Sequence, residues 1–399
     1  MSGARRPRLV ATLTTLTVLG VLGLTACDSG QERHPAAGPA PSSTAAPVPP
    51  ATVHAQPALD STDVAPTDPL RVDVADGKLS AVTVTDPAGA PVPGQLDPAG
   101  TAWPATGELA YGTAYAVQAV AVDGAGRSTT TAGTITTVRP RNQTMPSVFP
   151  ADRSTVGVGQ PVSVTFDEDV TDRAAVEQRL HVTTTPPVAG SWSWIDDRTV
   201  HYRPEQYWPA HTHVAVDVDT YGLDVGKGVF GQASKHVEFD IGAKKVGVVD
   251  GHELVLRLYV DDQLVKSMPT SLGKASDPTP TGTYVVMQQS RKYTMRSATY
   301  GVPLDAPGGY ETPVDYASRL SNSGIFVHAA PWSVAQQGHR NVSHGCLNVS
   351  TADAGWFFDN FGRGDVVQVT GAGGPLPEWD GFGDWNTSWA DWTAGSALR

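Results

Sequence analysis

Short runs of alternating apolar and polar residues, separated by turn residues, dominate the sequence between residues 61 and 243. Two such runs read "LRVDVADGKLSAVTV" and "QPVSVTFDEDV", with Asp-Gly, Pro and Gly residues marking the turns. Successive side chains of a strand point to opposite faces of its sheet, so this pattern predicts strands with one buried face. The pattern disfavours a helical bundle and predicts a mainly β fold.

The alternating region divides into two blocks, residues 61–141 and 142–243. Each block has the length of one sandwich, about 100 residues, and its strand and turn spacing is immunoglobulin-like. Neither block contains a cysteine pair, so each core must depend on packing alone. Trp192 and Trp194 stand two residues apart in one predicted strand and are expected on the same face, in the core of the second sandwich.

The N-terminus predicts an export signal. Residues 1–26 contain three arginines, then an uncharged apolar run, and the segment "LTAC" ends at Cys27. This segment resembles the cleavage box of bacterial lipoproteins, in which the cysteine becomes the lipid-carrying N-terminus; the apolar run is short for a transmembrane helix. We therefore expect a lipid anchor on the outer face of the cell membrane, in the cell-wall space. Residues 27–60, rich in Pro, Ala, Ser and Thr, are expected to be a disordered tether.

Charge and cysteine content limit the partners. The chain carries a formal net charge of −12, and removal of the signal would take away three arginines and no acids. An acidic chain of this kind argues against nucleic-acid binding. The two cysteines are Cys27 and Cys346, so lipidation of the first would leave the second without a disulfide partner. An unpaired thiol outside the cytoplasm is either buried and inert or kept for its reactivity.

Residues 244–371 form a third block of predicted strands with one helical candidate, "STADAGWFFDNF". Ser350 or Thr351 would cap this helix at its N-terminus. Residues 372–399 contain four tryptophans, which are costly to leave in water. We expect this C-terminal tail to be a cap that packs onto the third block.

Cys346 stands in the segment "HRNVSHGCLNVS", between potential catalytic groups. A nucleophilic cysteine needs a base, hydrogen-bond donors for an oxyanion, and space for the substrate. His344 lies two residues before Cys346, and His328 lies 18 residues before it. Gly345 lets the backbone approach a ligand closely. The spacing leaves open which histidine is the base.

The segment "HAAPWSVAQQGHRNVSHGCLNVS" resembles the signature of the L,D-transpeptidases, whose catalytic domain is of the YkuD type. That signature is a histidine, a spacer, and then Ser/Thr-His-Gly-Cys, a variable residue and Asn or Arg. Here the spacer of 14 residues separates His328 from Ser343-His344-Gly345-Cys346-Leu347-Asn348. The layout also resembles actinobacterial members, with a lipoprotein signal, two immunoglobulin-like modules, a catalytic domain and a C-terminal cap.

The resemblance implies a role for each matching residue. Cys346 would be the nucleophile and His328 the general base, oriented by the carbonyl of Ala329. His344, with the amides of Gly345 and Cys346, would stabilise the oxyanion. Residues 291–324 would form a mobile lid with a hinge at Gly308-Gly309. The implied substrate-binding residues and channel walls are Ser343, Tyr310, Ser323, Gly324, Asn348, Met295, Tyr300 and Trp332.

The same resemblance implies an enzyme that cross-links peptidoglycan stem peptides. A tetrapeptide donor would acylate the cysteine and release D-alanine, and a diaminopimelate side chain of a second stem would accept the acyl group. No cofactor is expected, and carbapenem β-lactams would act as inhibitors. Two alternatives stay open: an L,D-carboxypeptidase that uses the same thioester, and a non-catalytic wall-binding lipoprotein. Papain-like and NlpC-like peptidases are disfavoured because their cysteine precedes the histidine.

Some L,D-transpeptidases bind calcium near the start of the catalytic domain. The similar stretch here, "LDVGKG", retains Asp224 and Gly228. Lys227 stands where an acidic ligand would help, and a cationic side chain is a poor partner for calcium. No metal site is predicted.

Overall fold

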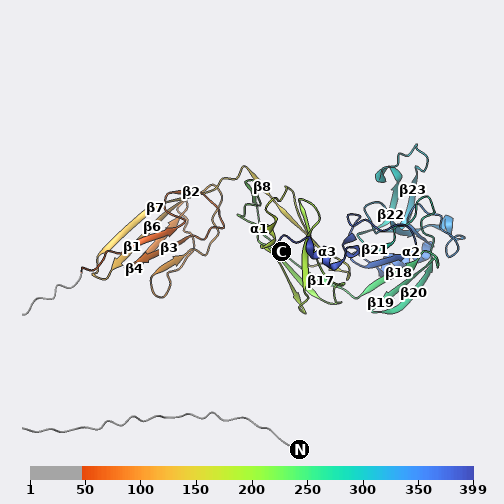
Figure 1. The fold of residues 1–399 in the computed structure, drawn as a ribbon, viewed down its shortest axis with the longest axis horizontal. Helices are drawn as coiled ribbons and strands as arrows, with labels where there is room; N and C mark the ends of the chain where they lie inside the picture. Colours follow the sequence, from red (N-terminus) through yellow and green to blue (C-terminus); the bar gives the residue numbers. More distant parts are fainter. Residues whose placement is uncertain (1–46) are drawn as a thin grey trace, which may run out of the picture. The chain divides into compact units, whose positions relative to one another are not determined.

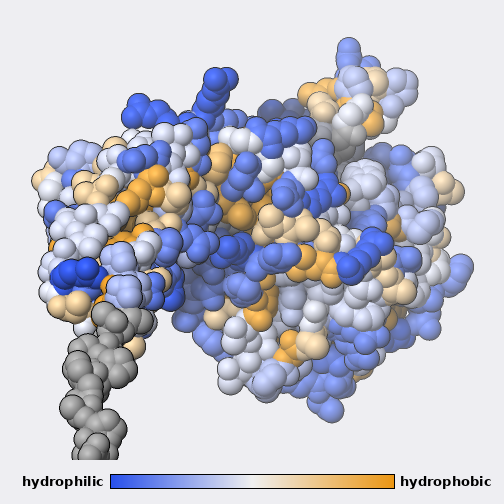
Figure 2. All heavy atoms as spheres, turned by 60° about the vertical axis from the view of Figure 1, so that its left-hand side comes forward, coloured by the Kyte–Doolittle hydropathy of each residue, from blue (hydrophilic) through white to orange (hydrophobic). Residues whose placement is uncertain are grey.

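The computed structural model describes residues 47–399, and these residues form a mainly β protein, as the alternation predicts (Figure 1). The predicted signal, the lipidation site Cys27 and the first part of the tether lie outside the described residues. Within the described part of the chain, no helix is long and apolar enough to cross a membrane. The face seen in Figure 2 is largely polar, with apolar side chains in small separate groups.

The first sandwich is built from strands β1 to β7. One strand in it corrects the sequence analysis, because β1 (Thr52–Gln56) lies inside the segment expected to be a tether and pairs antiparallel with β3 (Arg71–Ala75). In β6 (Ala114–Asp123), alternate residues from Tyr115 to Ala121 are buried and those between them face outward. The two sheets have the strand orders β1-β3-β5 and β2-β7-β6-β4, with β2 (Ser61–Val64), β4 (Gly77–Thr85), β5 (Ala102–Pro104) and β7 (Ser128–Thr137).

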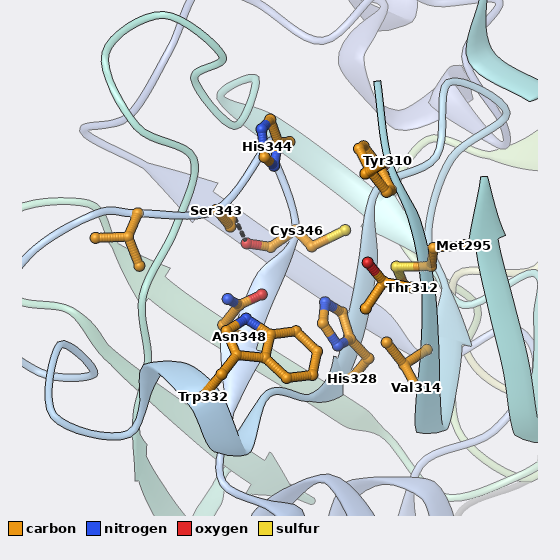
Figure 3. A pocket seen from close by; sticks show the side chains of 11 residues that line it. Met295, Tyr310, Thr312, Val314, His328, Trp332, Ser343, His344, Cys346 and Asn348 are labelled. Carbon is orange, nitrogen blue, oxygen red and sulfur yellow. Dashed lines mark hydrogen bonds between the residues drawn. The ribbon is translucent and has the colours of Figure 1, made fainter. Parts of the chain in front are cut away.

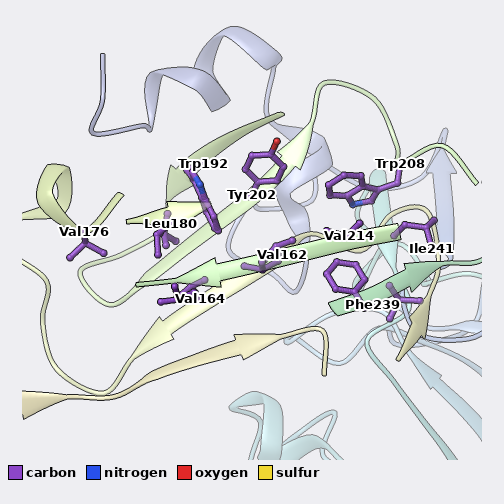
Figure 4. Close-up of a cluster of buried hydrophobic side chains, with 14 of the residues drawn as sticks. Val162, Val164, Val176, Leu180, Trp192, Tyr202, Trp208, Val214, Phe239 and Ile241 are labelled. Carbon is purple, nitrogen blue, oxygen red and sulfur yellow. The ribbon is translucent and has the colours of Figure 1, made fainter. Parts of the chain in front are cut away.

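The second sandwich packs a core of aromatic and valine side chains between two four-stranded sheets (Figure 4). Trp192 is buried in this core and Trp194 packs against it, as expected from their spacing. One sheet has the order β10-β17-β15-β12, with β10 (Thr155–Val156), β17 (Lys235–Ile241), β15 (His213–Val218) and β12 (Leu180–Thr185); the other is β13-β14-β11-β9, with β13 (Gly190–Trp194), β14 (Thr199–Pro204), β11 (Val162–Phe166) and β9 (Pro146–Phe149). A short parallel pair, β8 (Asn142–Thr144) and β16 (Val229–Gly231), and the helix α1 (Arg173–Glu177) complete it.

The third block holds two sheets and the predicted helix. Helix α2 (Thr351–Asn360) begins after Ser350, whose hydroxyl accepts a hydrogen bond from the amide of Asp353 at 3.1 Å. This confirms Ser350 as the cap. A five-stranded sheet has the order β20-β19-β18-β26-β21, with β20 (Gln263–Pro269), β19 (Val255–Val260), β18 (Lys245–Asp250), β26 (Val366–Thr370) and β21 (Gly282–Val285). A four-stranded sheet has the order β22-β23-β24-β25, with β22 (Gln288–Arg296), β23 (Glu311–Arg319), β24 (Phe326–Ala329) and β25 (Leu347–Val349).

The second sandwich and the third block meet along a seam, formed by Gly157–Gly159 and Arg363–Asp365. The amides of Gly157 and Gly159 donate to the carbonyls of Arg363 and Gly364 at 2.8 and 2.9 Å. A Cβ on Gly157 would lie 2.3 Å from the amide nitrogen of Asp365. Backbone therefore touches backbone here, and only glycine permits that approach.

The C-terminal tail packs on two surfaces, which corrects the expectation that it caps the third block alone. The short turn η3 (Gly383–Asn386) lies against β21 of the third block. The helix α3 (Trp389–Ala394) lies against β13 of the second sandwich, where Trp392 is fully buried and its Nε1 donates to the carbonyl of Ser191 at 2.9 Å. The tail therefore covers the outer face of a sandwich sheet as well.

Candidate active site

A cavity of about 340 Å³ opens beside the four-stranded sheet of the third block (Figure 3). Its walls come from the β22–β23 hairpin, from β24 and from the loop that leads into β25. Eight residues predicted from the sequence line it: Cys346, His328, His344, Ser343, Asn348, Met295, Tyr310 and Trp332. The sequence analysis missed three further lining residues, namely Thr312, Val314 and Val342.

Strand pairing brings Cys346 and His328 to the same cavity. Strands β24 and β25 are parallel, and their register sets His328 beside Asn348. Cys346 lies in the bend just before β25, two residues ahead of Asn348, and its side chain lines the same cavity as those of His328 and Asn348. Figure 3 shows the thiol and the imidazole directed into one space. Both are buried, with 6% and 3% of their surfaces exposed.

The imidazole of His328 is held in one tautomer. Its Nδ1 lies 2.8 Å from the carbonyl oxygen of Ala329, as the resemblance implied. A carbonyl oxygen only accepts, so Nδ1 carries the hydrogen and Nε2 keeps a lone pair. Burial lowers the pKa of His328 to about 4, against the opposing influence of the Ala329 carbonyl and the Asn348 side chain. The ring is therefore neutral at pH 7 and Nε2 can accept a proton.

The thiol of Cys346 is also neutral at rest. Its Sγ donates to the carbonyl of Gly324 at 3.4 Å, and burial raises its pKa to about 12. Burial therefore favours a neutral thiol and a neutral imidazole over a thiolate–imidazolium pair. Proton transfer from sulfur to His328 must accompany substrate binding or attack, when the developing charge meets new donors.

His344 occupies a different position from the one that a strand would give it. Residues 344–346 form a bend, and Gly345 has a φ of +117°. The Nζ of Lys274 lies 2.9 Å from His344 Nε2, and an ammonium group only donates, so it occupies the lone pair of that nitrogen. The ring stacks on Tyr310 with centroids 5.2 Å apart. These contacts leave His328 as the better-placed base.

The bend before Cys346 uses groups that were expected to contact substrate. The Ser343 hydroxyl donates to the carbonyl of Cys346 at 2.7 Å and accepts from the amide of Gly345 at 3.1 Å. Both groups are therefore paired within the bend in this structure, and the substrate-binding role of Ser343 and the oxyanion role of the Gly345 amide stay predictions. Gly345 is needed for shape, since a Cβ there would lie 2.7 Å from Cδ1 of Ile325.

Asn348 and Trp332 form the wall beside His328. The Nδ2 of Asn348 donates to Ser333 Oγ at 3.2 Å, whereas its Oδ1 is buried without a hydrogen bond. The Asn348 side chain also raises the pKa of His328, against the larger effect of burial. Trp332 lies on the turn η2 (Pro331–Ser333), is 57% exposed, and sets its ring 6.0 Å from that of His328. The exposed indole therefore forms part of the cavity wall.

Most of the segment predicted to be a lid, residues 291–324, is a paired hairpin, and its movement stays a prediction. Strands β22 and β23 pair antiparallel over most of this stretch. The connecting loop runs from η1 (Ser297–Tyr300) to Tyr310, and Ser297 exchanges two hydrogen bonds with Tyr310 at 3.0 and 2.9 Å. Burial raises the pKa of Tyr310 to about 12. The side chain of Tyr300 lies outside the described part of the structure.

Ser323 and Gly324 do not line the cavity directly. They lie in the turn between β23 and β24, where Gly324 offers its carbonyl to Cys346 and the Ser323 hydroxyl bonds to Asp380 of the tail. The residues missed by the sequence analysis fall into two groups, one with a local sequence signal and one without. Thr312 and Val314 share a strand face with Tyr310 through simple alternation, whereas Lys274 and Asp380 are distant in sequence and leave no local pattern.

Comparison with known proteins agrees with this geometry. The L,D-transpeptidase catalytic domain matches residues 244–369, and a bacterial Ig domain matches residues 61–224. L,D-transpeptidase 2 of Mycobacterium tuberculosis is 47% identical over 82% of this chain and 81% of that protein. L,D-transpeptidase 5 of the same species is 36% identical over 86% of this chain and 76% of that protein.

A solved structure of an LD transpeptidase, LdtMt1, in complex with imipenem covers 56% of this chain and 97% of that chain, with 38% identity and a TM-score of 0.50. The fold and site thus define a β-rich acyltransferase that carries bacterial Ig domains. The chain belongs to the L,D-transpeptidase family.

Proposed function

We propose that this protein cross-links peptidoglycan by L,D-transpeptidation through a thioester on Cys346. The observation that carries the proposal is that a buried thiol and a buried imidazole line one cavity, with the imidazole Nδ1 bonded to the Ala329 carbonyl so that Nε2 carries the lone pair. The 47% identity to L,D-transpeptidase 2 supports the reaction class.

In the first half-reaction, Cys346 Sγ attacks the carbonyl carbon of the third stem residue while His328 Nε2 takes the thiol proton. The tetrahedral intermediate then collapses, the carbon–nitrogen bond breaks, and D-alanine leaves with the proton from His328. A thioester remains. In the second half-reaction, the side-chain amine of a diaminopimelate on another stem attacks the thioester. His328 takes the amine proton and returns it to sulfur as the new amide forms.

Product analysis tests this proposal. Residues 48–399 are incubated with a disaccharide tetrapeptide, and the products are identified by mass spectrometry. We expect muropeptide dimers formed from two tetrapeptides together with released D-alanine. A reaction that yields tripeptide alone would instead identify an L,D-carboxypeptidase, because water would then be taking the acyl group.

The two histidines form a matched pair for testing the base. His328→Ala is expected to lower the rate of Cys346 acylation by about 100-fold or more, in the range for a lost general base. His344→Ala is expected to have a smaller effect, since Lys274 occupies its Nε2. Equal losses would assign the proton transfer to both side chains, and an unchanged rate in His328→Ala would remove it from the mechanism.

The structure of the relative LdtMt1 in complex with imipenem supports β-lactams as inhibitors of this protein. A carbapenem should add its mass to the intact protein and not to Cys346→Ala. An adduct-free wild-type protein, combined with unchanged wall attachment in Cys346→Ala cells, would favour a non-catalytic wall-binding role.

The proposed place of action is the outer face of the cell membrane, through lipid on Cys27. The support is the apolar run and the "LTAC" box in the sequence. Detergent partitioning of wild type and Cys27→Ala tests it: the wild type should follow the detergent phase, and the variant should not. Equal partitioning would contradict lipidation.

A further inference from the structure

A carboxylate of the C-terminal tail, Asp380, lies buried next to the turn that touches the catalytic thiol. Only 2% of Asp380 is exposed. Its Oδ1 accepts from the amide of Ser323 at 2.7 Å, and its Oδ2 accepts from the Ser323 hydroxyl at 2.5 Å. One side chain thus binds both donors of a single residue. That residue belongs to the turn Ser321–Gly324, between β23 and β24.

The bonds from Asp380 continue through the turn. Because the Ser323 hydroxyl donates to Asp380, the 2.9 Å contact between the two serine hydroxyls must be a donation from Ser321 to Ser323. Ser321 Oγ in turn accepts from the amide of Ile325 at 3.1 Å. The hydrogen-bonded chain therefore encloses Gly324 between residues fixed on both sides.

Gly324 is the residue that contacts the nucleophile. Its φ of +97° is a backbone conformation that other residues rarely adopt. Its carbonyl accepts a hydrogen bond from Cys346 Sγ at 3.4 Å. Burial raises the pKa of Tyr284, and Asp380 and Cys346 both add to that shift, so both lie within electrostatic reach of the same phenol.

We propose that Asp380 is a positioning residue for acyl transfer, which sets the Gly324 carbonyl and through it the direction of the Cys346 thiol. The inference rests on the proposed function of Cys346 and extends the site into the tail. Loss of the carboxylate leaves the Ser323 amide and hydroxyl without their acceptor, so the turn and the carbonyl move. A displacement of about 1 Å at a reacting group costs about 100-fold in rate.

The tail supplies a matched control. Asp384 is also 2% exposed, but it bonds to His201 Nδ1 of the second sandwich at 2.7 Å instead of to the active-site turn. Asp380→Ala and Asp384→Ala therefore both remove a buried carboxylate from the same tail. A purely structural role predicts similar damage from both, whereas positioning predicts a catalytic defect in Asp380→Ala alone.

The experiment measures imipenem acylation of Cys346 in residues 48–399 by mass spectrometry at several drug concentrations. For Asp380→Ala we expect the limiting rate constant to fall about 100-fold and the half-saturating concentration to change less than about twofold. Asp384→Ala should keep the wild-type rate constant. Equal loss in both variants, or a wild-type rate in Asp380→Ala, would overturn the proposal.

Two further measurements cover the cases in which these readouts fail. If Asp380→Ala does not fold, Ser323→Ala removes the hydroxyl link alone and should give a smaller loss of the same rate constant; no loss would count against positioning. If the wild type is not acylated, the proposed function fails, and alkylation of Cys346 by iodoacetamide tests positioning separately. Its pH–rate profile should shift to lower pH in Asp380→Ala only, because the Gly324 carbonyl stabilises the protonated thiol.

Discussion

The first and second sandwiches are built from similar alternating strands, yet they differ in how many sheet faces are covered. In β6 of the first sandwich, Gln118 and its alternate neighbours face outward. In β14 of the second sandwich, Val200 and Tyr202 face the core while His201 and Arg203 are also buried. The tail covers the second face of this sheet. An alternating sequence therefore predicts a strand, but it does not reveal whether its polar face meets water.

The polar side chains that the tail buries on this face need hydrogen-bond or aromatic partners. His201 bonds to Asp384 of the tail. The guanidinium of Arg203 lies 4.9, 5.4 and 4.5 Å from the ring centres of Trp385, Trp389 and Trp392, and its NH2 group donates to the tail carbonyl of Thr387 at 2.9 Å. Burial lowers the pKa of Arg203. Aromatic faces and carbonyls replace the water that the cation loses.

The largest expected effect on stability is at Trp392, in the tail that covers the second sandwich. We expect Trp392→Ala to lower the unfolding free energy of the second sandwich by about 3–5 kcal/mol, the usual cost of emptying a buried aromatic site. Denaturant unfolding followed by tryptophan fluorescence measures this loss. Trp379, in the same tail but 67% exposed, is the control, and its replacement by alanine should change the stability little. Equal effects would mean that the tail does not stabilise the sheet.

The pH dependence of the unfolding free energy should have opposite signs at the seam and in the first sandwich. Burial raises the pKa of Asp365 at the seam from 3.8 to about 7. The folded protein keeps a proton that the unfolded chain has lost, so stability falls as pH rises through this window. Asp365→Asn should remove this fall and gain about 2–4 kcal/mol relative to wild type between pH 4 and 8. Asn keeps an acceptor for the Gly362 amide.

Asp123 of the first sandwich is the counterpart with the opposite sign. Hydrogen bonds from the Arg127 amide, and then from its side chain, lower the pKa of Asp123. Its stabilising contribution is present above the unfolded pKa and is lost as pH falls through the folded one. Asp123→Asn should therefore weaken the protein near neutral pH and matter less in acid. Parallel pH profiles for the two variants would contradict this assignment.

Arg203→Ala should have a smaller effect than Trp392→Ala. The substitution removes the cation–π contacts and the bond to Thr387, so we expect a loss of about 2–3 kcal/mol in the unfolding free energy of the second sandwich. Thermal and denaturant unfolding measure it. A stabilised Arg203→Met variant would show that desolvation of the cation outweighs its contacts.

The smallest effect belongs to the open face of the first sandwich. Gln118→Ala should change stability by less than about 0.5 kcal/mol, as for other exposed surface sites. Only Trp103 among the ten tryptophans lies in the first sandwich, so circular dichroism complements fluorescence here. A loss comparable to that of Arg203→Ala would indicate a partner covering this face.

The sequence predicted what local pattern can encode. Alternation indicated most of the strands, Ser350 indicated the start of α2, and the residues around Cys346 indicated the site. The Pro-rich surroundings of β1 hid a strand that only its pairing with β3 reveals. The destination of the tail, the Lys274–His344 contact and the Asp380–Ser323 bonds also depend on tertiary pairing. Likewise, only the folded structure shows that Ile325 leaves no room for a Cβ at Gly345, in the bend that turns His344 away from a strand position.

The placement of the tail has a consequence for the timing of assembly. The ribosome makes the tail after every strand that it covers and after both Cys346 and His328. The outer face of the second sandwich and the turn beside the thiol therefore stay incomplete until these final described residues arrive. A chain interrupted before residue 380 would contain every residue of the family signature and still lack the carboxylate that holds the Ser321–Gly324 turn. The active-site turn thus depends on a segment that lies outside the family signature.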